Sequence, residues 1–220
     1  MKMTLFLVRH HLRMEMRSSH NIASLVLFAL ASVYTAMQVV GGKPDPSTWN
    51  AMAWIILMFT AFNSAARLLP EDLSSVRTYT HWTIPPRVMI LARTLHHALV
   101  MAVLSSLLLF FTGLFLGSAN MEFVDMMGFL AGMILTAVAL ASTLTLLSAL
   151  SARAGAGYGL TAILGLPLII PIVLISTQFG SDLISGIALA DTAENLLFLG
   201  VLSIGISIFG YVLFPYLWRS

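Results

Sequence analysis

The chain has no cysteine among its 220 residues, so disulfide bridges, thiolate metal sites and lipid-modified cysteines are excluded. Charge is scarce as well. Only 9% of the residues are charged, against about 25% in soluble domains, while 59% are hydrophobic and the mean hydropathy is +0.94. This composition is that of a membrane protein.

Six runs of the sequence contain no charged residue over a length that crosses a bilayer, which takes about 18 residues or more in a helix. They predict an all-α protein with six transmembrane helices at about residues 22–40, 49–66, 94–117, 126–150, 156–177 and 195–217. The connections between them are too short for a soluble domain. The sequence therefore predicts a single transmembrane domain over residues 1–220.

The basic residues are distributed very unevenly between the two sides of this topology. Ten of the eleven fall on the side of the N-terminus, and only Lys43 falls on the other. Basic residues collect on the cytoplasmic side of membrane proteins. Both termini are therefore expected in the cytoplasm, with an even number of crossings. The ten residues on that side are Lys2, Arg9, Arg13, Arg17, Arg67, Arg77, Arg87, Arg93, Arg153 and Arg219.

Residues 1–20 precede the first run and have a helical spacing. Arg9, Arg13 and Arg17 would form one stripe of a helix, beside a second, apolar stripe. The apolar stripe consists of Leu5, Val8, Leu12 and Met16. This pattern favours a helix that lies in the inner interface with its cations near lipid phosphates. The alternative is a plain basic flank that sets the topology.

Residues 67–93 form the longest inner connection and hold four of the eleven basic residues beside two acids. Pro70 and the acids that follow predict a helix start, and Pro85-Pro86 predicts its end. A short helix with aromatic residues and few charges suits docking to a partner, or alternatively anchoring among headgroups. The candidates for contact with a partner are Glu71, Asp72, Leu73, Val76, Arg77, Tyr79 and Trp82.

Sequence motifs for catalysis are missing. The phosphate-binding pattern GxxxxGK[ST] would need Gly42-Lys43, but Pro44 follows it. No HExxH or other metal spacing occurs. We therefore expect a non-catalytic chain that neither binds nor hydrolyses ATP. No charged residue falls at the middle of a run, which disfavours an ion-coupled carrier.

Two further pairs of residues allow more than one interpretation. His96 and His97 near the third run would point about 100° apart on a helix, so at most one faces a given site. We interpret them as packing or interfacial residues; the alternative is that one holds a haem iron or a proton. Pro167 and Pro171 remove two backbone donors and should bend the fifth helix, either as a gate or as a static kink. The outer connection, residues 182–194, is compatible with a short interfacial helix.

Two stretches carry a family resemblance: WNAMAWIILMFTAFNSAARLL at residues 49–69, and SARAGAGYGLTAILGLPLIIPIVLIS at residues 151–176. Between them lie the acidic loop that begins at Glu71-Asp72-Leu73 and the turn at Pro85-Pro86. With its length, six runs and basic N-terminus, the chain resembles the cytochrome c maturation protein B family (CcmB, haem exporter protein B) from end to end.

The resemblance implies a permease subunit of an ATP-binding-cassette (ABC) complex of the type-2 exporter kind, in the bacterial inner membrane. ATP would be bound by a separate CcmA-like ATPase subunit. Haem would be handled by the complex, with a CcmC-like haem-handling protein and a small CcmD-like subunit, and no cofactor is expected on this chain itself. A homodimer, or pairing with a related membrane subunit, is also expected. The alternatives are an exporter permease for a lipid, glycan or drug, and a membrane scaffold that transports nothing.

Overall fold

The computed structural model describes residues 2–17, 19–67, 84–119, 121–153 and 157–219, and all regular secondary structure within these ranges is helical. The helices are α1 (Lys2–Arg17), α2 (Ser19–Val40), α3 (Pro46–Ala65), α6 (Pro86–Leu116), α7 (Phe123–Arg153), α8 (Gly157–Ile184) and α9 (Ala193–Arg219).

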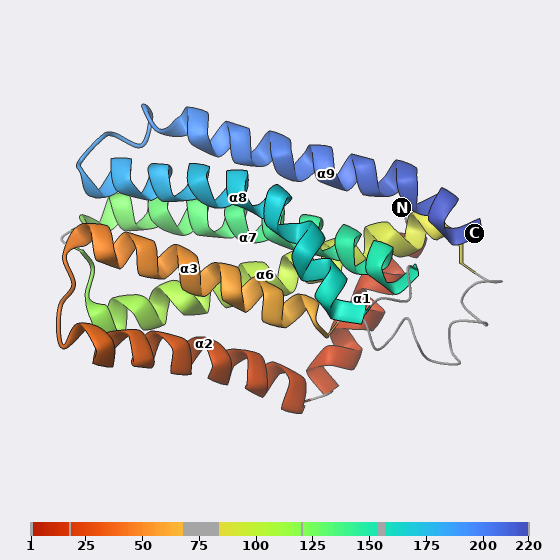
Figure 1. Ribbon diagram of the computed structural model, residues 1–220, viewed down its shortest axis with the longest axis horizontal. Coiled ribbons are helices and arrows are strands. Elements are labelled where there is room, and N and C mark those ends of the chain that lie inside the picture. The colour runs from red at the N-terminus through yellow and green to blue at the C-terminus, as the bar shows by residue number, and fades with distance from the viewer. Residues whose placement is uncertain (1, 18, 68–83, 120, 154–156, 220) are drawn as a thin grey trace.

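The long helices α2, α3, α6, α7, α8 and α9 run side by side, and each is antiparallel to the one before it (Figure 1). Helix α1 lies at one end of this bundle, where α9 also ends (Figure 1). We call this end the basic end, because the arginines of α1, Arg67 and the first two turns of α6 lie there. The connections 41–45, 117–122 and 185–192 form the opposite, acidic end, whose acids are Asp45, Glu122, Asp125, Asp182, Asp191 and Glu194.

Five of the described helices are long and apolar enough to cross a membrane: α2, α6, α7, α8 and α9. The chain is therefore a multi-pass membrane protein. Helix α3, the second of the six predicted spans, does not meet the same criterion. Polar side chains lower the mean hydropathy of this helix. Three of them, Asn50, Thr60 and Ser64, are buried and do not face outward. A transmembrane helix can carry polar side chains on the face that packs against other helices.

Helix α7 forms the centre of the bundle. It packs against α3, α6, α8 and α9, and every residue from 139 to 149 is buried. Two of its buried hydroxyl side chains donate to its own backbone: Thr136 Oγ1 to the Gly132 carbonyl and Thr143 Oγ1 to the Ala139 carbonyl, each at 2.8 Å. Such bonds satisfy a buried hydroxyl without a partner helix. The core is thus built around one helix that is hidden from lipid on most sides.

Helices α3 and α8 approach closely in the acidic half of the bundle. Asn50 Nδ2 donates to the Thr177 carbonyl of α8 at 2.9 Å, and Trp54 Nε1 donates to Asn50 Oδ1 at 2.7 Å. Gly180 of α8 makes this approach possible, since a Cβ placed there would lie 2.1 Å from Asn50 Oδ1. The ring of Phe129 packs on Trp54 from α7. Because Gly180 has no side chain, α3, α7 and α8 can pack closely here.

The helix ends at the acidic end are capped by local hydrogen bonds. Asp45 caps α3, since its Oδ2 accepts from the Thr48 amide at 3.0 Å. Hydrogen bonds from the Ser47 hydroxyl, the Thr48 hydroxyl and this amide lower the pKa of the Asp45 carboxyl. Helix α8 ends in a Schellman motif: the amide of Gly186, at φ 83°, donates to the Leu183 carbonyl, and the Ile187 amide to the Asp182 carbonyl.

Two connections differ from the sequence-based expectation. Residues 182–194 do not form a helix of their own: α8 continues to Ile184, its Schellman motif stops it, and turns lead to α9 at Ala193. Helix α6 begins at Pro86, with Pro85 as its N-cap residue. Residues 86–93, which were assigned to the inner connection, are therefore its first two turns. Proline suits this position because its fixed φ and missing N–H are tolerated in the first turn of a helix.

Candidate functional site

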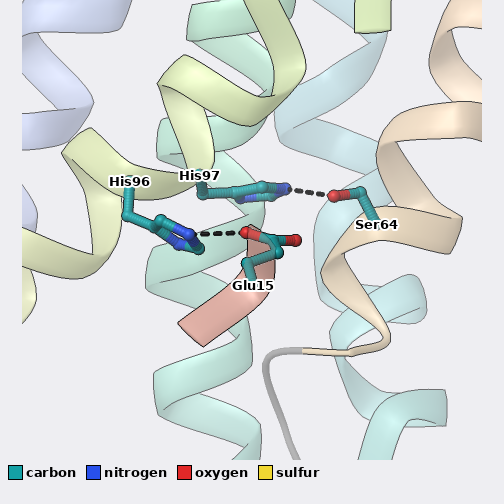
Figure 2. Close-up of polar contacts among 4 residues, drawn as sticks. All are labelled: Glu15, Ser64, His96 and His97. Carbon is teal, nitrogen blue, oxygen red and sulfur yellow. Dashed lines mark hydrogen bonds and ion pairs between the residues drawn. The ribbon is translucent and has the colours of Figure 1, made fainter. Parts of the chain in front are cut away.

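Buried polar side chains from three helices meet at His97 near the basic end, and Figure 2 shows the contact of His97 with Ser64. His97 belongs to α6 and is 2% exposed. Its Nε2 lies 3.1 Å from Ser64 Oγ at the end of α3, and its Nδ1 lies 2.9 Å from Thr145 Oγ1 of α7. The imidazole uses both nitrogens and so ties the ends of α3 and α7 to α6.

The neighbouring histidine points to a different helix. His96 Nε2 lies 2.6 Å from Oε2 of Glu15, which comes from α1 (Figure 2). The two side chains are only 13% and 19% exposed. His11, one turn before Glu15 on α1, packs edge-on against the His96 ring at 5.6 Å between centroids. His96 and His97 therefore fix α1, α3 and α7 to the same turn of α6, and we call Glu15, Ser64, His96, His97 and Thr145 the α6 joint.

Ionisation of the α1 side chains depends on this contact. The hydrogen bond with His96 lowers the pKa of Glu15, although partial burial opposes the shift, and the charges of His97 and Arg67 add to the lowering. Burial lowers the pKa of His11 to about 4, and the nearby His96 and Arg93 act in the same direction. The contact is therefore strongest when Glu15 is ionised and His11 is neutral.

The joint has the chemistry of a structural connection. An apolar contact between the same two helices accompanies it, since Leu7 and Val8 of α1 are buried against Ala92 of α6. In the part of the chain that the structure describes, no group of three or more His, Asp or Glu side chains is arranged to hold a metal ion. The His97 contacts and the Glu15–His96 pair join α1, α3 and α7 to α6.

Acidification is expected to loosen α1. Undocked His11 would titrate near its ordinary pKa of about 6.5, whereas docked His11 titrates at about 4, so protons favour the undocked state between these values. Ionised Glu15 stabilises docking above its ordinary pKa, and this contribution is lost as pH falls through its lowered value. Proteolysis of α1 in the purified protein should accelerate as pH is lowered from about 7.5 to about 5.

The His11→Gln variant tests this expectation, because glutamine keeps a polar side chain without a titrating group. This variant should remove most of the pH-dependent change in the proteolysis rate above about pH 5, and it should leave the change near the pKa of Glu15. His20, which is exposed on α2, provides the matched control. If His11→Gln retains the full pH dependence, burial of His11 does not control docking.

The predicted partner-contact residues lie outside the described residues. All seven, from Glu71 to Trp82, fall within residues 68–83. Pro167 and Pro171 are described: both lie inside α8, which changes direction along its length (Figure 1), and both are exposed on its outer side. In this arrangement they do not line the interior of the bundle.

Sequence reasoning did not select Glu15, Ser64 or Thr145. Glu15 had a signal, because it is the only acid before Asp45 and lies four residues after His11. Side chains at this spacing share one face of a helix. Ser64 and Thr145 had no signal, since serine and threonine are frequent in transmembrane helices and their partners are distant in sequence.

Over the residues that the structure describes, the fold is that of an all-helical, multi-pass membrane protein. Buried polar contacts at the α6 joint hold its helices together. A protein-family comparison then identifies the family: the model described as CcmB protein matches residues 2–215, so the chain belongs to the CcmB family. This confirms the resemblance found in the sequence. The family is the membrane subunit of the haem-export ABC system for cytochrome c maturation. No curated protein matches the chain.

Proposed function

We propose that this chain couples a separate ATPase subunit to haem delivery, or to release of the haem-loaded chaperone, during cytochrome c maturation. In this proposal it lies in the bacterial inner membrane with both termini in the cytoplasm. Family membership supports the role. The basic end supports the orientation, because positive charge gathers on the cytoplasmic side.

The proposed topology has six spans, with α3 as the second. Its 20 residues give a length of about 30 Å at 1.5 Å per residue, which matches the hydrocarbon thickness. Helix α3 runs alongside the spans on either side of it in the sequence (Figure 1). Its buried Asn50 and Ser64 explain why composition alone does not identify it.

The observation that carries the coupling proposal is the position of the α6 joint. The inner connection leaves α3 just after Ser64 and enters α6 at Pro86, about three turns before His97. Because His97 bonds Ser64 and Thr145 together, a force on the connection would move α3, α6 and α7 as one unit. In this mechanism the ATPase contacts Glu71–Trp82, and the bent α8 responds.

The proposed complex assigns the other tasks to partner subunits. The CcmA-like ATPase binds ATP, and the CcmC-like membrane protein, with a small CcmD-like subunit, handles haem. This chain holds neither ligand and supplies the moving helices. Two copies, or one copy beside a related membrane subunit, would enclose the route. Coupling requires two states that differ in their contacts with the ATPase.

Reversing the charge of the inner acids tests the proposal. The Glu71→Lys, Asp72→Lys variant should lose most of the co-purifying ATPase subunit and reduce the yield of holo-cytochrome c roughly tenfold or more, because like charge at an interface repels. The matched control is Glu122→Lys, Asp125→Lys, which makes the same change at the acidic end. Normal assembly and normal yield in the inner variant would exclude this contact.

Deletion of the gene distinguishes the proposed cargo from other cargoes. The proposal expects apocytochromes c without covalently attached haem, detected by haem staining, and rescue by the full chain. Normal haem attachment in the deletion strain would favour an exporter permease for another substrate.

A further inference from the structure

Helix α1 has two faces with different chemistry. Its inner face packs on α6 and α2, with Leu7 and Val8 buried and Glu15 paired with His96. Its outer face is the opposite side of the same helix. The residues of the outer face are Leu5, Phe6, Arg9, Arg13, Met16 and Arg17, all exposed.

The outer face combines cations with large apolar side chains. Arg9, Arg13 and Arg17 recur every four residues and follow one line along the helix. Phe6, at 69% exposed, and Met16, at 75%, lie among and beside them. The long arginine side chains can extend toward water while the apolar side chains enter the interface.

Charge on this face is entirely positive. Glu15 is the only acid of α1, and it is turned inward to His96 (Figure 2). The three arginines of the outer face therefore have no neutralising side chain on their own helix. A binding partner with closely spaced negative charges would complement them.

The position of α1 points to the membrane surface. Residue 18 alone separates α1 from α2, whose candidate span starts at Ile22. The end of helix α1 therefore lies next to the point where a transmembrane helix enters the hydrocarbon. A cationic helix at that level, with apolar side chains among its charges, has the pattern of helices that lie on anionic lipid.

We propose that the outer face of α1 is a binding surface for acidic phospholipid headgroups, with the arginines contacting phosphates and Phe6 inserted at the acyl boundary. The inner face transmits this contact to the bundle through the Glu15–His96 pair. The inference goes beyond the coupling of the ATPase and does not depend on it, since it concerns lipid and not the inner connection.

The absence of cysteine allows a direct test in the full-length protein. A single Phe6→Cys substitution is labelled with an environment-sensitive fluorophore, and the protein is reconstituted in bilayers that contain brominated phosphatidylglycerol or brominated phosphatidylcholine at equal fraction. We expect quenching by the anionic lipid to be at least about twofold stronger. Raising salt from about 0.05 M to about 0.5 M should remove the difference by screening.

Two controls separate the charge effect from position and folding. Arg9→Gln, Arg13→Gln and Arg17→Gln together should abolish the lipid preference, while Lys43→Gln at the acidic end should preserve it. A label at Phe123→Cys, 78% exposed at the acidic end, should show no preference. Unchanged helicity by circular dichroism shows that the triple variant is folded.

Three results would overturn the proposal. Equal quenching by the two lipids would remove the headgroup specificity. A preference that survives in the triple arginine variant would assign it to another part of the chain. Quenching by neither lipid would show that protein covers this face, in a second copy or another subunit.

Discussion

Replacing Gly180 with alanine is expected to lower the thermal unfolding midpoint of the detergent-purified protein by roughly 5 °C. The new Cβ would lie 2.1 Å from Asn50 Oδ1 and 2.7 Å from Trp54 Nε1. These atoms belong to a buried hydrogen bond between α3 side chains, so neither can move freely. Separating α8 from α3 would break the Asn50 contact with the Thr177 carbonyl, at a cost of about 1–3 kcal/mol.

Gly205→Ala provides the matched control for this prediction. Gly205 lies within α9, and a Cβ there would meet nothing within 4 Å. Alanine favours a helix more than glycine does by about 1 kcal/mol, so this variant should be neutral or slightly more stable. Equal effects of the two substitutions would show that backbone propensity, and not the close approach of α3 and α8, determines the outcome.

Replacing His97 with alanine is expected to destabilise the protein by about 2–4 kcal/mol. The substitution leaves a cavity where three helices meet and removes the partners of Ser64 and Thr145. Reduced stability should appear as a lower unfolding midpoint. Holo-cytochrome c yield should fall as well, because the inner connection would no longer move α3 and α6 together.

A double-mutant cycle separates the bond from the cavity. Ser64→Ala alone should cost about 1 kcal/mol, and the double variant should cost little more than His97→Ala, because both remove the same contact. His20→Ala, at an exposed histidine of α2, should have no effect. Additive losses at Ser64 and His97 would mean that the two side chains act independently.

Hydropathy was sufficient to predict an all-helical membrane protein, since a bilayer requires long apolar helices whose backbone bonds are internal. Hydropathy identified α3 less clearly, because this helix contains polar residues. Packing against other helices buries them, and the sequence pattern does not reveal that burial. The start of α6 was placed eight residues late, because Arg87 and Arg93 interrupt the apolar run while the helix continues through them. Composition identifies where hydrocarbon ends, not where a helix ends.

The candidate site was predicted only in part. The interpretation of His96 and His97 as two residues with different directions follows from helix geometry, and their contacts with Glu15 and Ser64 agree with it. The pairings themselves were not predictable, because the partners lie 81 and 33 residues away in the chain. The inner residues from Glu71 to Trp82 remain a prediction from sequence.

By itself the sequence determined what each segment is made of: no thiol, little charge, a basic side and a family pattern from end to end. The scarcity of charge and the basic side follow from the bilayer, which acts on each segment separately. Only the tertiary structure decided which polar groups meet. It turned Glu15 inward to His96, joined α3 to α7 through His97 and left the arginines of α1 facing outward. Side-chain contacts of this kind depend on the relative placement of helices, which local composition does not specify.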